Sequence, residues 1–353
     1  MKIGFILPGS CRFPCGGFKV VFEYANFLAT RGHDVSIYFD CVNSLKRFHL
    51  PEFIRKIANQ ILVKKRPAWF NLDSRVRKVC IFGISDKTID DNDAIFATAV
   101  ETAIYVSRLS SIKGNKYYLI QDYENWNISD IEVQSTYLLG MTNIVVSKWL
   151  NNIVSKFTHS ILISNSINGD VFNIQTPITN RNKKSLIFHW RTANHKGGIY
   201  ALQLIEKLHQ KYPDFKFTAV SNQPKPNDFP CYISYVYNAS PEEVARLNNQ
   251  HALFVCTSVA EGFGLPGLEG MACGCVLVSS GYQGVYDYAI DGKNALISPV
   301  KDADAMFLNI EKLLLNDSLR VRLAQAGHDC AMKRTLAVTG NQMEQLLLSH
   351  LNQ

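Results

Sequence analysis

The sequence of 353 residues contains no apolar run long enough to cross a membrane, no low-complexity tract and no internal repeat. Its nine cysteines are odd in number and scattered, and the close sets Cys11/Cys15 and Cys273/Cys275 lack the second half of a zinc site. Met1 leads almost directly into an apolar strand pattern, which is unlike a signal peptide. These absences exclude a membrane span and a disulfide framework, and they predict reduced thiols and a cytoplasmic location.

The pattern that is present is an alternation of short β-rich runs with segments of helical period, which predicts parallel sheets with crossover helices. Apolar residues make up 47% of the chain and charged residues 19%, as in a globular protein with a full core. The expected strands of the first half are 3–7, 35–39, 79–84, 94–99, 117–121, 143–146 and 160–163. Those of the second half are 186–190, 215–220, 233–237, 253–257, 276–279 and 295–298.

The length and this pattern predict an α/β protein of two Rossmann-like, doubly wound domains. We place the first domain at 1–166 and the second at 167–335, and we expect the polar, Pro-containing segment 173–184 to be a linker. Two such domains facing each other would form a central cleft at the carboxyl ends of their strands, where sheets of this kind bind ligands.

The stretch EGFGLPGLEGMACG, residues 261–274, follows the expected strand 253–257 and therefore lies on the ligand side of its sheet. Pro266 suits the first turn of a helix, and glycines at 262 and 264 let the backbone approach a ligand with its N–H groups exposed. Glu261 and Glu269 can then accept hydrogen bonds from two sets of hydroxyls. This pattern predicts a site for a ligand that carries two sets of hydroxyls with a phosphate between them.

This stretch resembles the donor-site signature of retaining GT-B glycosyltransferases of family 4, and the resemblance extends over most of the chain. The segments that carry it are PGSCRFPCGGFKVVFEYANFLATRGHDVSIY near the start, LISNSINGDVF at 162–172, FHWRTANHKGG at 188–198 and GYQGVYDYAIDGKNALISPVKDADAM after the donor helix. The resemblance implies a GT-B fold, with 1–166 as the acceptor domain, 167–335 as the nucleotide-sugar donor domain and 336–353 as a helix that crosses back to the first domain.

The resemblance also implies roles for individual residues. Glu261 would bind the transferred sugar, Glu269 the nucleotide ribose, and the pair Arg191 and Lys196 the donor diphosphate, where fixed cations stabilise the negative charge of the leaving group. These implied positions are the catalytic set Glu261, Arg191 and Lys196, and the substrate-binding set Gly16, Gly17, Gln121, Asp122, Gly262, Phe263, Gly264, Leu265, Glu269, Gly284 and Val285.

The donor sugar is suggested by one departure from the family pattern. Members often carry a histidine after the strand that we place at 117–121, where it reaches the 6-hydroxyl of the donor, but this chain has Gln121 followed by Asp122. The segment YYLIQDYE looks similar to bacterial rhamnosyltransferases of the family, whose donor sugar lacks that hydroxyl. We therefore lean to dTDP-rhamnose, and UDP- and GDP-hexoses stay open.

A metal site is not expected. Asp91, Asn92 and Asp93 match the D-x-D of metal-dependent glycosyltransferases, but they precede an expected strand at its amino end, away from the ligand side. The resemblance implies a metal-independent retaining transfer that uses the nucleotide sugar as co-substrate and needs no cofactor. Positioning and charge stabilisation would then provide most of the catalysis.

The segment 45–70 carries seven basic residues and one acid, interleaved with large apolar side chains. It could lie on an anionic membrane surface, at the inner face of the plasma membrane, or form a partly buried helix with a solvated basic face. Nucleic acid is a poorer partner for it, because no nucleic-acid fold signature appears.

The function expected from these features is transfer of a sugar from a nucleotide-sugar donor to a glycan or lipid-linked acceptor, in the synthesis of a cell-surface polysaccharide such as lipopolysaccharide. A sugar epimerase of the same fold would need acid–base residues acting on the sugar itself, and the motif set argues against it. A non-catalytic GT-B protein that binds a nucleotide sugar is the alternative outside enzymes.

Overall fold

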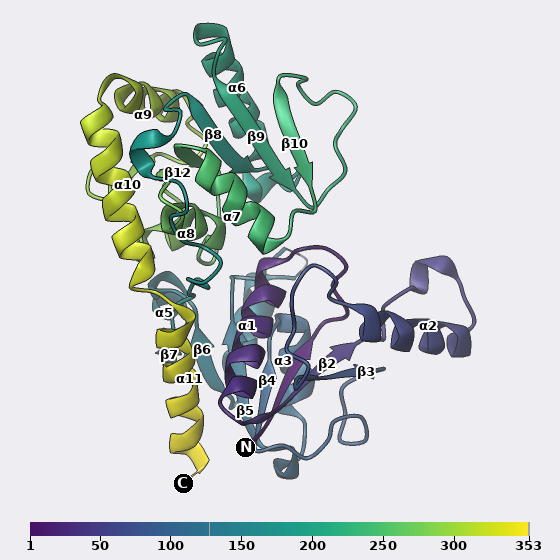
Figure 1. The fold of residues 1–353 in the computed structure, drawn as a ribbon. Helices are drawn as coiled ribbons and strands as arrows, with labels where there is room; N and C mark the ends of the chain where they lie inside the picture. The colour runs from purple at the N-terminus through teal and green to yellow at the C-terminus, as the bar shows by residue number, and fades with distance from the viewer. Residues whose placement is uncertain (127, 352–353) are drawn as a thin grey trace. The chain divides into compact units, whose positions relative to one another are not determined.

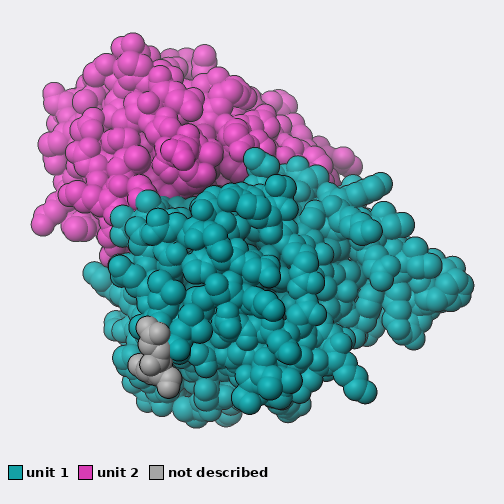
Figure 2. Space-filling view, turned by 60° about the horizontal axis from the view of Figure 1, so that its bottom comes forward, with its two compact units in different colours: residues 1–165, 336–353 teal, residues 166–335 magenta. Residues whose placement is uncertain are grey.

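The computed structural model describes residues 1–126 and 128–351, and the chain divides into two compact units (Figures 1 and 2). Unit 1 comprises Met1–Asn165 together with Leu336–Gln353, and unit 2 comprises Ser166–Thr335. The last two residues of the expected C-terminal segment lie outside the described residues. Each unit has its own parallel sheet.

The sheet of unit 1 has seven parallel strands in the order β3-β2-β1-β4-β5-β6-β7. Their bounds are β1 Lys2–Leu7, β2 Asp34–Asp40, β3 Arg77–Ile81, β4 Ala94–Ala97, β5 Asn115–Ile120, β6 Thr142–Val145 and β7 Ser160–Leu162. The central strands are continuous apolar runs because helices cover both faces of a doubly wound sheet. The chain order reverses between β1 and β4, which makes their carboxyl ends the switch point of unit 1.

The helices of unit 1 are α1 Gly16–Thr30, α2 Glu52–Lys65, α3 Val100–Ser107, α4 Asp130–Thr136, α5 Lys148–Val154 and α11 Leu336–Leu351. Although α11 comes last in the sequence, it packs lengthwise against α1 (Figure 1). Gly340 permits this approach, since a Cβ there would lie 2.6 Å from the ring of Phe27. At the far end of α11, His350 Nδ1 lies 2.9 Å from the Tyr117 hydroxyl.

The sheet of unit 2 has six parallel strands in the order β10-β9-β8-β11-β12-β13. Their bounds are β8 Ser185–His189, β9 Lys216–Ser221, β10 Ile233–Tyr237, β11 Leu253–Cys256, β12 Val276–Ser280 and β13 Ala295–Ser298. The helices around it are α6 Gly198–Lys211, α7 Pro241–Gln250, α8 Leu265–Ala272, α9 Ala303–Leu315 and α10 Asp317–Met332. In this sheet the chain order of the strands reverses between β8 and β11.

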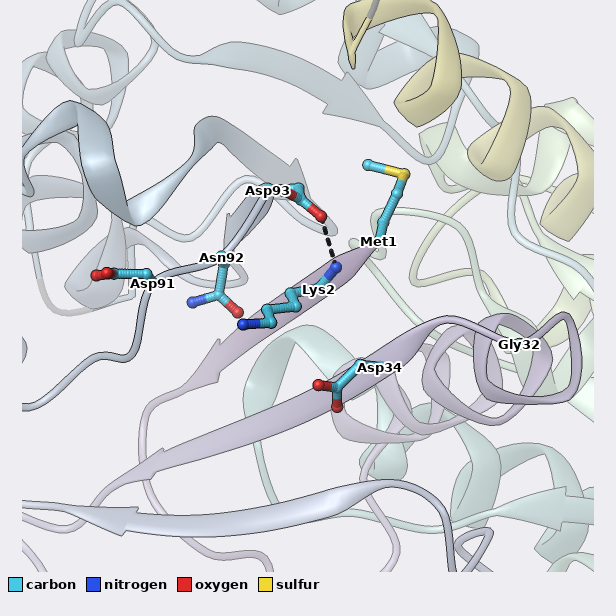
Figure 3. Close-up of a pocket in the computed structure, with 7 residues that line it drawn as sticks. All are labelled: Met1, Lys2, Gly32, Asp34, Asp91, Asn92 and Asp93. Atoms are coloured by element: carbon cyan, nitrogen blue, oxygen red, sulfur yellow. Dashed lines mark hydrogen bonds between the residues drawn. The ribbon is translucent and has the colours of Figure 1, made fainter.

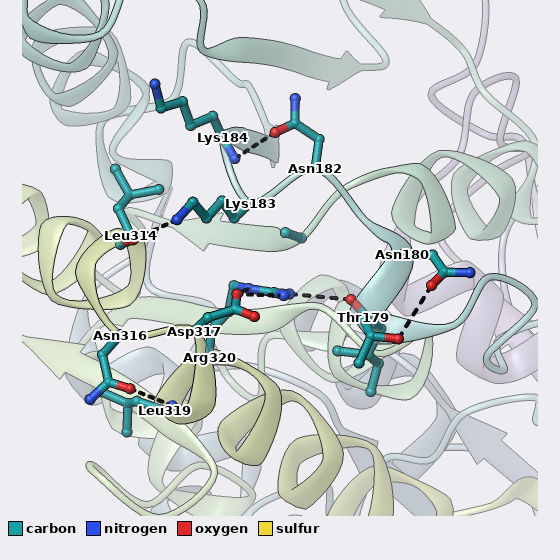
Figure 4. A network of polar contacts seen from close by, with 12 residues as sticks. Thr179, Asn180, Asn182, Lys183, Lys184, Leu314, Asn316, Asp317, Leu319 and Arg320 are labelled. Carbon is teal, nitrogen blue, oxygen red and sulfur yellow. Dashed lines mark hydrogen bonds and ion pairs between the residues drawn. The ribbon is translucent and has the colours of Figure 1, made fainter.

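The segment 173–184 is part of unit 2, so the prediction of a linker there is wrong. Its single turn Ile178–Asn180 is held by Arg320 of α10, whose buried guanidinium donates to the Ile178 carbonyl and pairs with Asp317 (Figure 4). Arg181 is also buried and donates to the carbonyl oxygen of Cys273 at 2.6 Å. Buried bonds of Arg181 and Arg320 to backbone carbonyls thus tie the segment to unit 2, although several of its polar side chains are exposed.

Among the described residues, the helices are each too short or too polar to cross a membrane. The prediction of two Rossmann-like α/β domains is confirmed by the two parallel sheets. Most strand ends differ from the expected ones by one to three residues, as expected where β-rich runs continue into loops that the pattern cannot separate.

Candidate functional site

The candidate site of unit 2 lies at its switch point. Lys196 follows β8 and Glu261 follows β11, the two adjacent parallel strands between which the chain order reverses. Their carboxyl ends meet at one edge of the sheet, which is where sheets of this type bind ligands. The structure therefore brings together two of the three side chains that the sequence marked as catalytic.

Glu261 is held from two sides. Lys196 Nζ lies 2.8 Å from its Oε2, and the Ser258 hydroxyl donates to its Oε1 at 2.9 Å. The side chains of Lys196 and Glu261 are 30% and 18% exposed, so the pair is partly shielded yet reachable by a ligand. Ser258 was missed by the sequence reasoning, although its place three residues before Glu261 in the same loop is a usable signal.

The loops that carry this pair are tied together by their backbones. The His195 carbonyl accepts hydrogen bonds from the N–H groups of Val259 at 2.8 Å and Ala260 at 3.3 Å. Gly197 adopts φ +65°, and a Cβ there would collide with the carbonyl oxygen of Thr257. These contacts fix the spacing between Lys196 and Glu261 before any ligand binds, which is the preorganisation that electrostatic catalysis requires.

The bend after Glu261 is buried and carries backbone donors without an acceptor. Within residues 1–126 and 128–351, no oxygen accepts a hydrogen bond from the N–H of Gly262, Phe263 or Gly264. Gly264 is the N-cap of α8, where the helix dipole adds a partial positive charge. The turn 283–287 packs closely on this bend, because a Cβ on Gly284 would lie 2.7 Å from the Glu261 carbonyl oxygen. An anion at the bend would find unpaired donors.

Glu269 lies in the second turn of α8 and is 6% exposed, so its carboxylate is largely shielded from water. Leu265 and Val285 are buried apolar residues. Arg191 directs Nη1 to the carbonyl oxygens of Trp190 at 2.7 Å and Val220 at 3.1 Å, at the ends of β8 and β9. Its guanidinium is thus anchored on the backbone at the ends of these two strands.

The sequence-predicted residues of unit 1 gather at the carboxyl ends of β1 and β5. Gly17 is the second residue of α1, and a Cβ there would lie 3.3 Å from Nε2 of Gln121, so the start of α1 packs against the Gln121 amide. Gln121 Oε1 is buried and has no partner among the described residues. Gly16 is open to solvent, and Asp122 accepts a hydrogen bond from the N–H of Tyr123 at 2.9 Å.

Glu124 is a further residue at this edge that sequence reasoning did not single out. Its Oε2 accepts a hydrogen bond from the N–H of Val100, the first residue of α3, at 2.7 Å. Burial raises the pKa of Glu124 to about 7, and the neighbouring carboxylates of Glu101 and Asp122 act in the same direction. This carboxyl group can therefore hold or release a proton near neutral pH.

We expect Glu124→Gln to remove a pH dependence of stability. A carboxyl whose pKa is higher in the folded state stabilises the fold below its unfolded pKa, and this contribution is lost as the pH rises through about 7. The unfolding free energy of the variant should therefore exceed that of the wild type by about 3 kcal/mol at pH 8 and differ little at pH 4.5. Urea unfolding at both pH values measures the difference, and an equal difference at both would contradict the expectation.

The Asp91–Asn92–Asp93 motif lies at the amino ends of the strands of unit 1, around a cavity of about 400 Å³ (Figure 3). Asp93 accepts a hydrogen bond from the N–H of Lys2 at 2.7 Å, and Asp91 pairs with Lys113 at 2.8 Å. Both carboxylates are thus engaged by the protein. Within the described part of the chain, the His, Cys, Asp and Glu side chains form no group of three suited to a metal ion.

Two Rossmann-like units with parallel sheets define the GT-B class of fold, and solved structures of that class match nearly the whole chain. The sucrose-phosphate synthase of Thermosynechococcus elongatus aligns with a TM-score of 0.76 at 15% identity, over 99% of both chains. HepE of Anabaena, solved with UDP and glucose, aligns with a TM-score of 0.74 at 14% identity, over 99% of this chain and 100% of that one. These similarities establish the fold.

Residues 172–329 match the family model of Glycosyl transferases group 1. The chain is also similar to an uncharacterized glycosyltransferase of Methanocaldococcus jannaschii, at 29% identity over 102 residues, which are 29% of each chain. It is 36% identical over 77 residues to the lipopolysaccharide core biosynthesis glycosyltransferase LpsE of Rhizobium meliloti, 22% of this chain and 23% of that one. The matched segments thus span less than a third of these relatives.

Proposed function

We propose that this protein is a glycosyltransferase that moves a sugar, with retention of its anomeric configuration, from a nucleoside-diphosphate donor to a hydroxyl of a glycan or lipid-linked acceptor. The observation that carries the proposal is the Lys196–Glu261 pair at the switch point of unit 2, inside the region that matches the group 1 glycosyltransferases. Unit 2 would hold the donor, and unit 1 the acceptor.

The arrangement suits loss of a diphosphate. As the bond between the sugar and the diphosphate breaks, negative charge grows on the leaving oxygen, and Lys196 with Arg191 would stabilise it together with the N–H groups of the bend. The acceptor hydroxyl would attack on the face that the diphosphate leaves, and a phosphate oxygen would take its proton. The two cations supply charge that a metal ion supplies in other transferases, which supports a metal-independent reaction without a resident cofactor.

Glu261 and Glu269 would divide the rest of the donor between them. The carboxylate of Glu261, fixed by Lys196 and Ser258, would accept hydrogen bonds from sugar hydroxyls, and Glu269 would accept them from the ribose. For the sugar itself we retain dTDP-rhamnose as the leading donor, since Gln121 replaces a histidine that would contact a 6-hydroxyl. A UDP-hexose is the second candidate, favoured by the UDP complexes of HepE and of S. aureus TarM, whose fold is also similar (TM-score 0.76, 11% identity).

The test is incubation of the purified protein with dTDP-rhamnose, UDP-hexoses and GDP-hexoses in water, with release of the nucleoside diphosphate followed by chromatography. We expect slow hydrolysis of one donor class, with the freed sugar first appearing in the configuration of the donor by proton NMR. Release of the opposite anomer would exclude the retaining reaction. Release of the nucleoside diphosphate from a UDP-hexose alone would contradict dTDP-rhamnose as the donor and would still support the transferase function.

We further propose that the segment 45–70 contacts an anionic membrane, where a lipid-linked acceptor and a place in polysaccharide synthesis would be found. Phe53, Ile57 and Ile61 stand one turn apart on α2 and are 65%, 55% and 50% exposed, so its apolar stripe faces solvent. The opposite side is buried through Asn59 and Val63. α2 stands out beyond the edge strand β3 (Figure 1), and its last turn carries Lys64 and Lys65. An exposed apolar stripe with lysines beside it fits an anionic lipid surface.

The double variant Phe53→Asp/Ile57→Asp is expected to reduce binding to vesicles that contain anionic lipid at least fivefold, because two charges would enter the apolar layer. Co-sedimentation with anionic and with neutral vesicles measures the effect, and 0.5 M salt should weaken the wild-type binding. Ile112→Asp, an equally exposed position elsewhere in unit 1, is the control. Unchanged binding of the double variant to anionic vesicles would contradict a membrane contact through α2.

A further inference from the structure

Two buried tyrosines lie directly beneath the bend of the candidate donor site. Tyr282 and Tyr288 are 1% and 2% exposed and stand at either end of the turn 283–287. Their hydroxyl oxygens are 2.9 Å apart, and Tyr288 donates to the carbonyl oxygen of Gly264 at 2.8 Å. Because the Tyr288 proton goes to Gly264, Tyr282 donates to Tyr288, and the two hydroxyls form a chain that ends on the bend.

Gly264 is held in a conformation that the rest of the helix does not share. Its φ of +89° is left-handed, and a Cβ would lie 2.7 Å from Cζ of Tyr282 and closer still to the hydroxyl oxygen. The ring of Phe263 packs on that of Tyr288 with centroids 5.1 Å apart. Burial raises the pKa of both tyrosines, so both hydroxyls stay protonated and available as donors at neutral pH.

The carbonyl and the N–H groups of the bend are engaged differently. With the Gly264 carbonyl turned inward to Tyr288 and also accepting from the N–H of Gly267 at 3.1 Å, the N–H groups of Gly262, Phe263 and Gly264 are left without acceptors among the described residues. Unpaired amides at a helix N-terminus bind anions when their geometry is fixed.

We propose that Tyr288, supported by Tyr282, is a positioning residue that holds the Gly262–Gly264 amides ready for the phosphate of the donor. The inference rests on the proposed function, because it assigns positioning residues to the same donor site. It adds residues that contact no ligand themselves and act through the backbone of Gly264. Their effect should therefore fall on the phosphate part of the donor and leave the nucleoside part unaffected.

The experiment compares Tyr288→Phe with Tyr286→Phe, a tyrosine on the same turn that is 55% exposed. UDP, dTDP and GDP are titrated by calorimetry, and the nucleoside of whichever diphosphate binds is titrated by NMR. We expect Tyr288→Phe to raise the Kd of the diphosphate at least fivefold while the Kd of the nucleoside changes less than twofold. Tyr282→Phe should show a smaller effect of the same kind, and Tyr286→Phe none.

Each other outcome overturns a different statement. Equal weakening of diphosphate and nucleoside by Tyr288→Phe would mean general loss of structure and would contradict the positioning role, as would wild-type affinity for both. Glu269→Ala is the contrasting variant, since loss of a ribose contact should raise the Kd of the nucleoside as well as that of the diphosphate. If the wild type binds none of the three diphosphates, the proposed function itself fails, and the inference fails with it.

Discussion

Lys196→Ala is expected to lower kcat by about 100- to 1000-fold with a much smaller change in the KM of the donor. Lys196 Nζ lies 2.8 Å from Glu261 Oε2, at the strand end where the diphosphate would leave. A fixed cation there stabilises the leaving oxygen more strongly in the transition state than in the bound donor, because charge on that oxygen grows as the bond breaks. Steady-state rates of nucleoside-diphosphate release measure the effect.

Two further variants test whether the effect is specific to Lys196 and does not follow from the loss of any positive charge. Lys293→Ala removes an exposed lysine of the same unit and should leave kcat unchanged. Ser258→Ala keeps Lys196 but frees one oxygen of Glu261, so it should cost less than Lys196→Ala. A Lys196→Ala enzyme that retains kcat and loses only donor affinity would show that the lysine binds ground state and transition state alike, contrary to the proposed role.

Gly264→Ala is expected to cost at least about 3 kcal/mol of unfolding free energy and to abolish donor binding. Two penalties combine: φ at this residue is +89°, and the new methyl group would overlap the ring and hydroxyl of buried Tyr282. Since Tyr282 is enclosed on all sides, the backbone of the bend would have to move. Urea unfolding and a donor titration on the same preparation measure both effects.

Gly292→Ala is the matched control for this substitution. Its φ is +68°, also left-handed, but no heavy atom lies within 4 Å of the added Cβ. It should therefore show the conformational penalty alone, about 1 kcal/mol, with donor binding intact. If Gly264→Ala were no worse than Gly292→Ala, the close packing of Tyr282 under the bend would be contradicted.

The sequence was sufficient for the fold class because strands in doubly wound sheets are continuous apolar runs that helical segments separate. It also placed Glu261 in the loop after a strand, since the apolar run Leu253–Cys256 is followed by two polar residues and, after Glu261, by a glycine-rich bend. The Lys196–Glu261 contact joins positions 65 residues apart, and it required the order β8-β11, which no local pattern contains. The parallel pairing of those strands is what turns two separate motifs into one pair.

What the sequence could not provide depends on long-range burial. The segment 173–184 is polar, as linkers are, but its arginine finds buried carbonyls on distant elements of unit 2. Tyr282 and Tyr288 have ordinary aromatic neighbours in sequence, and only the folded turn places their hydroxyls under Gly264. The pKa of Glu124 is raised by an environment assembled from several strand ends. The roles of the individual site residues stay predictions.

The measurement that most directly tests the central claim, a nucleotide-sugar site at the switch point of unit 2, is a thermal-shift panel with UDP-, GDP- and dTDP-sugars on the wild type and on Glu269→Ala. A ligand that binds the folded state raises the midpoint in proportion to its occupancy. We expect one donor class to raise the wild-type midpoint, with dTDP-rhamnose the leading candidate, and the shift to be lost in Glu269→Ala. No shift with any donor at millimolar concentration, or an undiminished shift in the variant, would contradict the site as described.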